Sequence, residues 1–254
     1  MNSKNRNLKI SIITVVKNCE DYIENNILSL LGQTYKNYEH IIINGNSTDN
    51  TKKIIDKYYS KISKIIHEPD FGLYDAMNKG INLSTGDVIG ILNADDYFYP
   101  HALQVVNNYF QRNENIDFLF GSVNKYNKIY SGYYPIKLYW TFGFYSSHSV
   151  GFFIKKKSQF KLGFYNTKYK YSADYDLFYR MIIKEKMKGS STKKNEVVGY
   201  FRSGGLSERI KYIDYLNENT QIRLDNKQNF IIVKIIHYLR YLRRLRLIFN
   251  QKKL

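Results

Sequence analysis

The sequence has little cysteine and little proline: Cys19 is the single cysteine, and there are three prolines in 254 residues. One cysteine excludes an internal disulfide framework and a zinc site built from cysteines, which fits a reducing cytoplasm. With 43% hydrophobic residues, the composition is typical of a globular protein rather than a disordered chain. The length predicts one domain of α/β size with an appendage.

Long apolar runs are also missing. The first nine residues are polar and the run from Ile10 to Val16 has the length of a strand, so we expect no secretory signal. No stretch approaches the ~18 apolar residues that a membrane-spanning helix needs. These absences predict a cytoplasmic location.

Acidic residues are scarce toward the C-terminus. The formal net charge is +17, and residues 226–254 contribute eight basic side chains and no acidic one. The basic residues of this tail are Lys227, Lys234, Arg240, Arg243, Arg244, Arg246, Lys252 and Lys253. An excess of this size implies an anionic partner, and almost half of it lies in the tail.

Strand-like and helix-like segments alternate through the first hundred residues. The predicted strands are 9–16, 38–44, 64–68 and 87–93, and the predicted helices are 22–33, 46–62 and 74–84. This order predicts an α/β fold with a mostly parallel sheet and crossover helices. The tyrosine-rich second half is less regular, with strand-like pieces at 118–123 and 150–156 and a helix around 173–184.

Polar residues follow several of these strands directly. In such sheets, ligands bind beyond the carboxyl ends of the strands. The residues found there are Asn18, Asn44, Asn93, Ala94, Asp95 and Asp96. The adjacent aspartates fit either a turn that starts a helix or a site for Mg²⁺ or Mn²⁺, which prefer carboxylate oxygens and share them with substrate phosphates.

Two further segments carry candidate side chains. In "EPDFGLYDAMNKG" a turn leads into a helix that starts with Asp75, Asn78 and Lys79, and both a helix N-terminus and a lysine favour an anionic ligand. In "SADYDLFYRM", Asp174 and Asp176 point in different directions if the segment is helical. Asp174 alternatively caps the helix, and Asp176 then faces solvent or pairs with Arg180.

Together these segments resemble family 2 glycosyltransferases with the GT-A fold, in particular bacterial enzymes that build surface polysaccharides such as capsule and lipopolysaccharide. The segments are "SIITVVKNCEDYIENNILSLLGQTYKNYEHIIINGNSTDNT", "EPDFGLYDAMNKGINLSTGDVIGILNADDYFYP", "ADYDLFYRM" and "FRSGGLS". The resemblance implies a nucleotide-sugar donor, by family habit a UDP-sugar, with Mn²⁺ or Mg²⁺ as cofactor and inversion at the anomeric carbon. The sugar, a hexose or N-acetylhexosamine, passes to a hydroxyl of a lipid-linked or growing saccharide.

The resemblance also implies roles by position. Thr14, Val16 and Asn44 line the base and ribose pocket, while Asn78 and Lys79 lie near the nucleotide and its phosphates. Asn93-Ala94-Asp95 occupies the place of the family's Asp-x-Asp motif, with Asp95 as metal ligand and Asp96 supporting it. Asp174 is the catalytic base, and His148 matches a histidine near the acceptor site, although a lone histidine is otherwise structural. Asn44 and Asn93 stand where the family often has Asp, Ala173 where it has Glu, and Ser149 where it has Gln.

The tail is predicted to form an amphipathic helix. Its apolar side is Ile231, Ile235, Tyr238, Leu242, Leu245 and Phe249, and its basic side holds Arg240, Arg243 and Arg244. Such a helix either packs on the catalytic domain or lies on an anionic bilayer. No helix-turn-helix, zinc or RNP-type motif favours nucleic acid instead.

We therefore predict a glycosyltransferase domain at 1–225, with a nucleotide-sugar half at about 9–100 and an acceptor half at about 101–225. Residues 226–254 would attach it peripherally to the inner face of the cytoplasmic membrane, and a homo-oligomer is possible. Two other functions remain open: a sugar nucleotidyltransferase, and an inactive sugar-binding or scaffold protein of the same fold. "VVKNCEDY" lacks the glycine-rich phosphate loop of the former.

Overall fold

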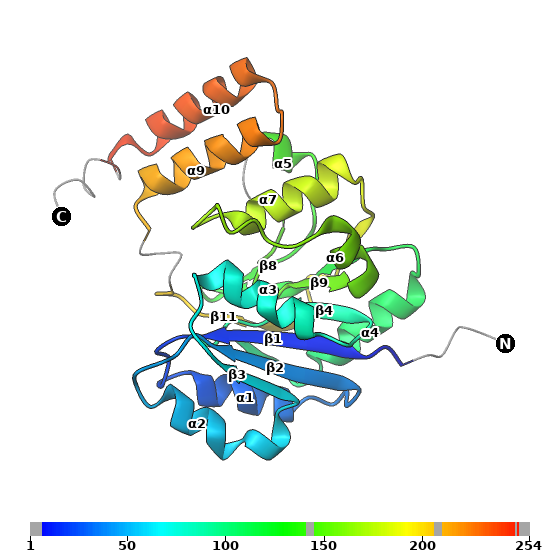
Figure 1. Ribbon diagram of the computed structural model, residues 1–254. Helices are drawn as coiled ribbons and strands as arrows, with labels where there is room; N and C mark the ends of the chain where they lie inside the picture. The colour runs from blue at the N-terminus through cyan, green and yellow to red at the C-terminus, as the bar shows by residue number, and fades with distance from the viewer. Residues whose placement is uncertain (1–6, 141–144, 206–209, 247, 249–254) are drawn as a thin grey trace.

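A seven-stranded sheet forms the centre of the molecule in the computed structural model, which describes residues 7–140, 145–205, 210–246 and 248 (Figure 1). The strand order is β10-β6-β9-β4-β1-β2-β3. The strands are β1 (Ile10–Val16), β2 (Tyr38–Asn44), β3 (Lys64–His67), β4 (Val88–Ile91), β6 (Phe118–Phe120), β9 (Phe152–Lys155) and β10 (Gly189–Ser191). Strands β1 to β4 are mutually parallel and β9 is antiparallel to its neighbours, so the mostly parallel sheet is confirmed.

A smaller four-stranded sheet has the order β5-β11-β7-β8. Its strands are β5 (Tyr97–Phe98), β7 (Ser122–Lys125), β8 (Lys128–Tyr130) and β11 (Val197–Phe201). The apolar segment 118–123, predicted as one piece, divides between the two sheets at Gly121. A Cβ atom at Gly121 would lie 2.6 Å from the side chain of Val198, so this close approach of β11 needs a glycine there.

Helices cover both faces of the central sheet, and two more form an outer layer (Figure 1). The helices are α1 (Ile23–Leu31), α2 (Thr51–Lys57), α3 (Leu73–Leu83), α4 (Ala102–Arg112), α5 (Lys137–Trp140), α6 (Lys156–Leu162), α7 (Ala173–Tyr179), α9 (Tyr212–Asp225) and α10 (Phe230–Arg243). A 3₁₀ turn at Tyr59–Lys61 follows α2, and a π-helical turn at Arg180–Lys184 continues α7. Helices α1 and α2 lie on one face, α3 and α7 lie on the other, and α9 and α10 stack beyond α7.

The β-branched run of β1 explains its central position. All seven of its residues are buried, because both faces of the strand are covered. Ile13 and Val15 pack in the core shared with α3 and α7, whereas Ile10 and Ile12 pack in the core shared with α1 and α4. The helix predicted at 46–62 is shorter in the structure, where α2 begins at Thr51 and ends at Lys57.

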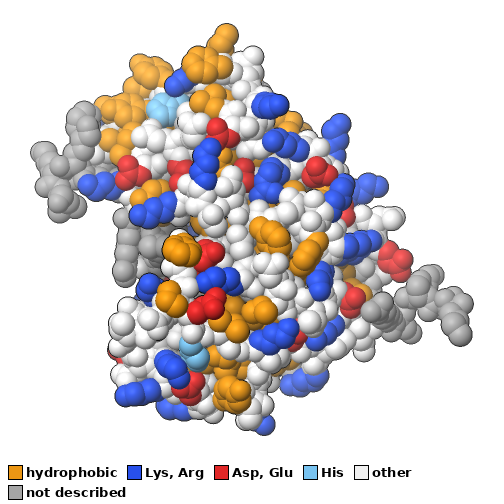
Figure 2. All heavy atoms as spheres, viewed as in Figure 1, with side chains coloured by type: hydrophobic (Ala, Val, Ile, Leu, Met, Phe, Trp, Pro, Cys, Tyr) orange, Lys and Arg blue, Asp and Glu red, His pale blue; other side chains and the backbone are white. Residues whose placement is uncertain are grey.

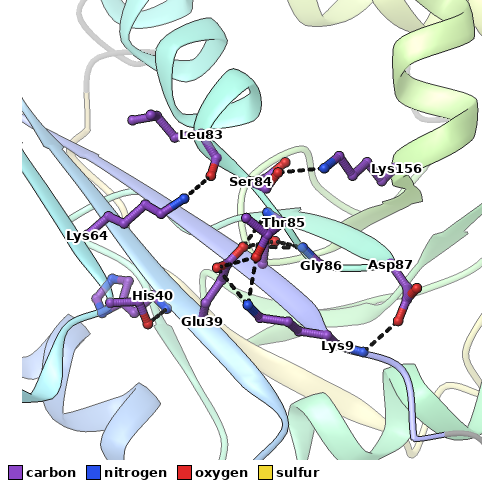
Figure 3. Close-up of polar contacts among 12 residues, drawn as sticks. Lys9, Glu39, His40, Lys64, Leu83, Ser84, Thr85, Gly86, Asp87 and Lys156 are labelled. Atoms are coloured by element: carbon purple, nitrogen blue, oxygen red, sulfur yellow. Dashed lines mark hydrogen bonds and ion pairs between the residues drawn. The ribbon is translucent and has the colours of Figure 1, made fainter.

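A buried carboxylate joins the strands at their amino ends, at the opposite edge from the predicted site (Figure 3). Glu39 of β2 accepts hydrogen bonds from the hydroxyl of Ser11 on β1 at 2.6 Å and the hydroxyl of Thr85 before β4 at 2.7 Å. The Lys9 ammonium lies 3.0 Å from the same carboxylate. Burial alone would raise the pKa of Glu39, but these hydrogen bonds outweigh it and lower the pKa to about 2.

We predict that Glu39→Gln lowers the free energy of unfolding at neutral pH by roughly 3 kcal/mol, the value of the pKa shift. Because the folded-state pKa is depressed, the wild-type contribution is complete above the unfolded pKa near 4.5 and is lost as the pH falls toward 2. Urea unfolding at pH 7 and pH 3 measures both effects. The exposed control Asp56→Asn should change stability by less than ~1 kcal/mol, and an equal loss in both variants would contradict the assignment.

Candidate functional site

The loops after β1 and β2 are bonded to each other at the carboxyl edge of the sheet. The side-chain oxygen of Asn18 accepts the Thr48 N–H at 2.8 Å, and the Asn18 N–H donates to the Ser47 hydroxyl at 2.9 Å. That hydroxyl donates to the side-chain oxygen of Asn44 at 2.6 Å. Asn18 and Asn44 therefore lie at the predicted rim with their acceptor oxygens used by the loops, and Val16 is buried beneath them.

A buried amide holds the loop that carries the acidic pair. Thr14 is fully buried and its hydroxyl donates to the side-chain oxygen of Asn26 at 3.2 Å. The Asn26 amide in turn donates to the carbonyl oxygens of Asn93 and Asp96 at 2.9 and 3.0 Å. The Thr14 side chain thus supports the rim through Asn26 and is not exposed to a nucleotide in this structure.

The adjacent aspartates have different surroundings. Asp96 is 2% exposed and accepts the Ser149 hydroxyl at 2.5 Å and the Arg202 N–H at 2.9 Å. Burial, together with the charge of Asp95, raises the pKa of Asp96 to about 7. Asp96 therefore bonds three segments together inside the protein, and the carboxylate offered to a ligand is that of Asp95.

Asp95 is half-buried and forms no salt bridge with any residue that the structure describes. Burial raises the pKa of Asp95, and the charge of Arg202 opposes this rise. The Arg202 guanidinium carbon lies 3.4 Å from the centroid of the Tyr22 ring, a cation–π contact. A Cβ atom at Gly205 would lie 3.1 Å from Asp95 Oδ2, so the described part of "FRSGGLS" borders the carboxylate.

Two neighbours of Asp95 limit the chemistry available here. The side-chain oxygen of Asn93 is buried and has no hydrogen-bond partner among the described residues, so it can accept from a ligand. Burial and then the charge of Asp95 raise the pKa of Cys19 to about 12, which keeps the thiol protonated and excludes it as a nucleophile. Ala94, between the two polar positions, is buried.

A second carboxylate lies at the start of α7 among tyrosines. Asp174 Oδ1 accepts the Tyr74 hydroxyl at 3.2 Å and the Tyr175 N–H at 2.9 Å, while Oδ2 lies 3.4 Å from the Tyr145 hydroxyl. Burial, and then the charge of Asp174, raise the pKa of Tyr74 and Tyr145 well above the usual value, so both remain hydrogen-bond donors. Asp174 itself is half-buried and forms no salt bridge within the described part of the chain. Asp176, by contrast, is buried and pairs with Arg180 at 2.9 Å.

Adjacent residues connect the two carboxylate clusters. Ser149 bonds to Asp96 and accepts the Asn93 N–H at 2.9 Å. His148 Nε2 lies 2.7 Å from the Tyr165 hydroxyl. Burial lowers the pKa of His148, and the charge of Asp174 opposes this change. His148 is therefore a neutral imidazole in the electrostatic field of Asp174, and the dipeptide 148–149 contacts both clusters.

The predicted phosphate-contacting residues of α3 are bonded within the protein. The Asn78 amide bonds the Tyr165 backbone twice, both times at 2.9 Å. The Lys79 ammonium lies 2.9 Å from Glu68 and 3.4 Å from Asp75. Asp75 also accepts the Phe71 N–H at 3.1 Å. In this structure, these three side chains stabilise the loop before α3 and the loop around Tyr165.

Sequence reasoning missed several side chains at this edge: Tyr22, Asn26, Asp70, Tyr74, Tyr145, Tyr165 and Arg202. Asp70 follows β3 and packs directly on Gly45, where a Cβ atom would lie 1.9 Å from its Oδ2. A polar residue at a buried helical position was the available signal for Asn26. The tyrosines carried no signal, because their role depends on contacts between distant segments.

Two surface hollows lie away from these carboxylates. One of about 510 Å³ is lined by residues near β10, and one of about 480 Å³ is lined by residues that include Lys155, Lys156 and Phe160. Neither hollow is lined by Asp95, by Asp174 or by the unpaired side-chain oxygen of Asn93. No group of three or more His, Cys, Asp or Glu side chains within the described ranges could hold a metal ion by itself.

Curated relatives share parts of this sequence. A hyaluronan synthase of Pasteurella multocida is 36% identical over 103 residues, which cover 40% of this chain and 11% of the synthase. An uncharacterized glycosyltransferase of Rickettsia typhi is 28% identical over 203 residues, which cover 68% of this chain and 58% of that protein. The chain thus spans less than two thirds of the length of either relative.

Solved structures share the fold at low identity. S. aureus TarS 1–349 in complex with UDP-GlcNAc superimposes with a TM-score of 0.66 at 16% identity, covering 90% of this chain and 70% of TarS 1–349. The mannosyltransferase PcManGT from Pyrobaculum calidifontis, in complex with GDP-Man and Mn²⁺, gives a TM-score of 0.64 at 15% identity, covering 94% of this chain and 71% of PcManGT.

Glycosyl transferase family 2 matches residues 11–181, which is more than half of the sequence. The chain therefore belongs to glycosyl transferase family 2.

Proposed function

We propose that this protein transfers a sugar from a nucleoside diphosphate sugar to a saccharide hydroxyl by a single, metal-dependent displacement with inversion. The observation that carries the proposal is the junction at His148 and Ser149, which joins a ligand-facing Asp95 to a tyrosine-bounded Asp174. One carboxylate suits the departing diphosphate and the other suits the incoming hydroxyl. Two acids with these separate roles fit a direct displacement.

The donor side offers acceptors and one cation. Asn93 Oδ1 is an unpaired buried acceptor that suits a ribose hydroxyl, and Asp70 over Gly45 suits an N–H of the base. Arg202 stands beside Asp95 and supplies a positive charge for the diphosphate. We propose UDP as the nucleotide, and the similarity to a TarS structure holding UDP-GlcNAc supports this choice.

The residues present fit a divalent metal that is shared with the substrate. Asp95 is a carboxylate with no salt bridge among the described residues, and an unsatisfied Asn93 oxygen lies two residues before it. One carboxylate with substrate phosphates is a usual environment for Mg²⁺ or Mn²⁺, so the absence of a three-residue cluster is compatible with it. When bound by Asp95, the ion would stabilise negative charge on the diphosphate.

On the acceptor side, Asp174 Oδ2 takes the proton of the acceptor hydroxyl. Its Oδ1 already holds two hydrogen bonds, from Tyr74 and Tyr175, which fix the carboxylate while Oδ2 keeps one long contact. The acceptor oxygen then attacks the anomeric carbon, and the bond from that carbon to the phosphate oxygen breaks. The bonding electron pair leaves with the diphosphate toward Arg202. His148, neutral beside Tyr165, lies where it can orient the acceptor.

We further propose that the acceptor is a lipid-linked or growing saccharide of a bacterial surface polysaccharide, and that the donated group is a hexose or N-acetylhexosamine. The similarity to a protein named hyaluronan synthase supports a polysaccharide acceptor. A thermal-shift screen of nucleotide sugars with and without Mn²⁺ identifies the donor, because a ligand bound only by the native state raises the melting temperature. No stabilisation by any nucleotide sugar, with or without Mn²⁺, would contradict the proposal.

We predict that Asp174→Asn lowers kcat by ~10²–10⁴-fold with little change in the KM for the donor, because only the proton acceptor is lost.

Asp95→Asn should lower Mn²⁺-dependent turnover by at least ~100-fold and abolish the Mn²⁺-dependent thermal shift with the donor. Transfer of labelled sugar measures both changes. The exposed Asp56→Asn serves as control, and full turnover in either site variant would overturn the assigned roles.

We predict that Ser149→Ala lowers the free energy of unfolding by ~1–3 kcal/mol and lowers kcat as well, because it removes a donor to the buried Asp96 and an acceptor of the Asn93 N–H. Ser158→Ala is the matched control. Its buried hydroxyl donates to Asp117 at 2.7 Å, away from the site. Both variants should lose stability in urea unfolding, but only Ser149→Ala should lose turnover. Equal turnover in the two variants would show that Ser149 has no role at the site.

A further inference from the structure

Helix α10 packs on the protein by one narrow face. Val233 and Ile236 are buried, and α9 is its neighbour in the outer layer (Figure 1). Asn229 caps its N-terminus by accepting the N–H groups of Ile231 and Ile232 at 3.0 and 3.2 Å. The helix is therefore a well-formed element that needs little of its surface for packing.

The outward face of α10 is apolar. Six of its large side chains are between 46% and 67% exposed: Phe230, Ile231, Ile235, Tyr238, Leu239 and Leu242. Figure 2 shows hydrophobic side chains gathered on the outer layer of the molecule, at the top left. Four of the six belong to the apolar stripe predicted from the sequence. Phe249 lies outside the described residues, and the stripe is contiguous because positions 231, 235, 238 and 242 fall on one helical face.

Basic side chains border this apolar face. Lys234, Arg243, Arg244 and Arg246 are exposed, and residues 226–254 contain no acid. Arg240 departs from the predicted basic side, because its guanidinium turns toward the Tyr215 ring on α9, 5.9 Å from the centroid. An apolar stripe with flanking cations and no acids is complementary to an anionic interface with an apolar interior.

The position of α10 relates this face to the proposed acceptor site. The helix runs so that its last residues lie on the side of the molecule at which β1 ends (Figure 1). The neighbouring helix α9 contacts the start of α7, since the Asn219 amide donates to the Ser172 hydroxyl at 3.3 Å. Burial raises the pKa of Tyr215 on the same helix, and the charge of Asp174 adds to this rise. A surface that docks α10 is thus brought to the same edge as Asp174.

We propose that α10 docks on the surface of an anionic phospholipid membrane, with its apolar stripe below the headgroups and its arginines among them. This gives the protein a peripheral position on the inner face of the cytoplasmic membrane. No helix within the described residues is both long and apolar enough to cross a bilayer. A second copy of the chain is a poorer occupant, because two basic faces repel and the tail contains no acidic complement. The inference stands apart from the proposed chemistry, since it concerns binding alone.

Vesicle sedimentation of the full chain tests this docking. We expect binding to vesicles that contain phosphatidylglycerol, weaker binding to pure phosphatidylcholine, and a loss of binding at high salt. The triple variant Ile231→Ser, Ile235→Ser, Leu242→Ser should weaken binding by at least ~10-fold. Arg243→Gln with Arg244→Gln should weaken it by about 30-fold on the anionic vesicles only, at ~1 kcal/mol for each charge.

Matched controls separate the face from general exposure and charge. Tyr59→Ser with Ile136→Ser removes two side chains of similar exposure from other surfaces, and Lys57→Gln with Lys61→Gln removes two exposed charges near α2. Both controls should bind vesicles as the wild type does. Absence of vesicle binding by the wild type would overturn the proposal, as would a dimer in solution that the triple variant dissociates. Donor turnover in detergent-free buffer should be equal in all variants, which keeps this test independent of the chemistry.

Discussion

A buried carboxylate must be hydrogen-bonded, and at Asp96 this requirement joins the segments at the carboxyl edge of the central sheet. Moving an ionised carboxylate out of water costs several kcal/mol unless donors replace the lost water. The donors here come from two distant segments, the Ser149 hydroxyl and the Arg202 N–H. The loop after β4, the segment before β9 and the end of β11 are thereby joined at one side chain. Asp95, its neighbour in the sequence, is only half-buried and borders Gly205.

The second carboxylate is organised differently. Asp174 receives neutral donors, two tyrosine hydroxyls and one backbone N–H, rather than a cation. These donors fix the orientation of the carboxylate. The tyrosines that do this stay protonated because they are buried beside a negative charge. The two carboxylates thus differ in their surroundings, and residues 148 and 149 contact both clusters. This difference is why the proposed function assigns charge binding to Asp95 and proton acceptance to Asp174.

The strands of the first half were predictable because their apolar runs are continuous and separated by polar loops. β1, β2 and β3 fall within or close to the predicted ranges, and so does α3. The position of Asp95 and Asp96 after a strand was predictable from the sequence, whereas His148 was singled out by the family resemblance alone. Three features could not be predicted: the tyrosines around Asp174, the hydrogen bonds of Asn26 to the loop after β4, and the position of Arg202. Each depends on contacts between segments more than 25 residues apart. Asn78 and Lys79 make contacts that the sequence did not indicate, with the Tyr165 backbone and with Glu68, and their placement near the nucleotide stays a prediction.

The Glu39 cluster has a consequence for how this scaffold can diversify. It holds β1, β2 and the turn before β4 together at the amino ends of the strands, whereas the loops after the same strands carry the side chains of the proposed site. Substitutions in those loops leave the hydrogen bonds of Glu39 intact. The preference of the proposed site for a sugar or nucleotide can therefore change without loss of the central sheet. The residues that stabilise the framework and the residues proposed to select the substrate therefore lie in separate segments of the sequence.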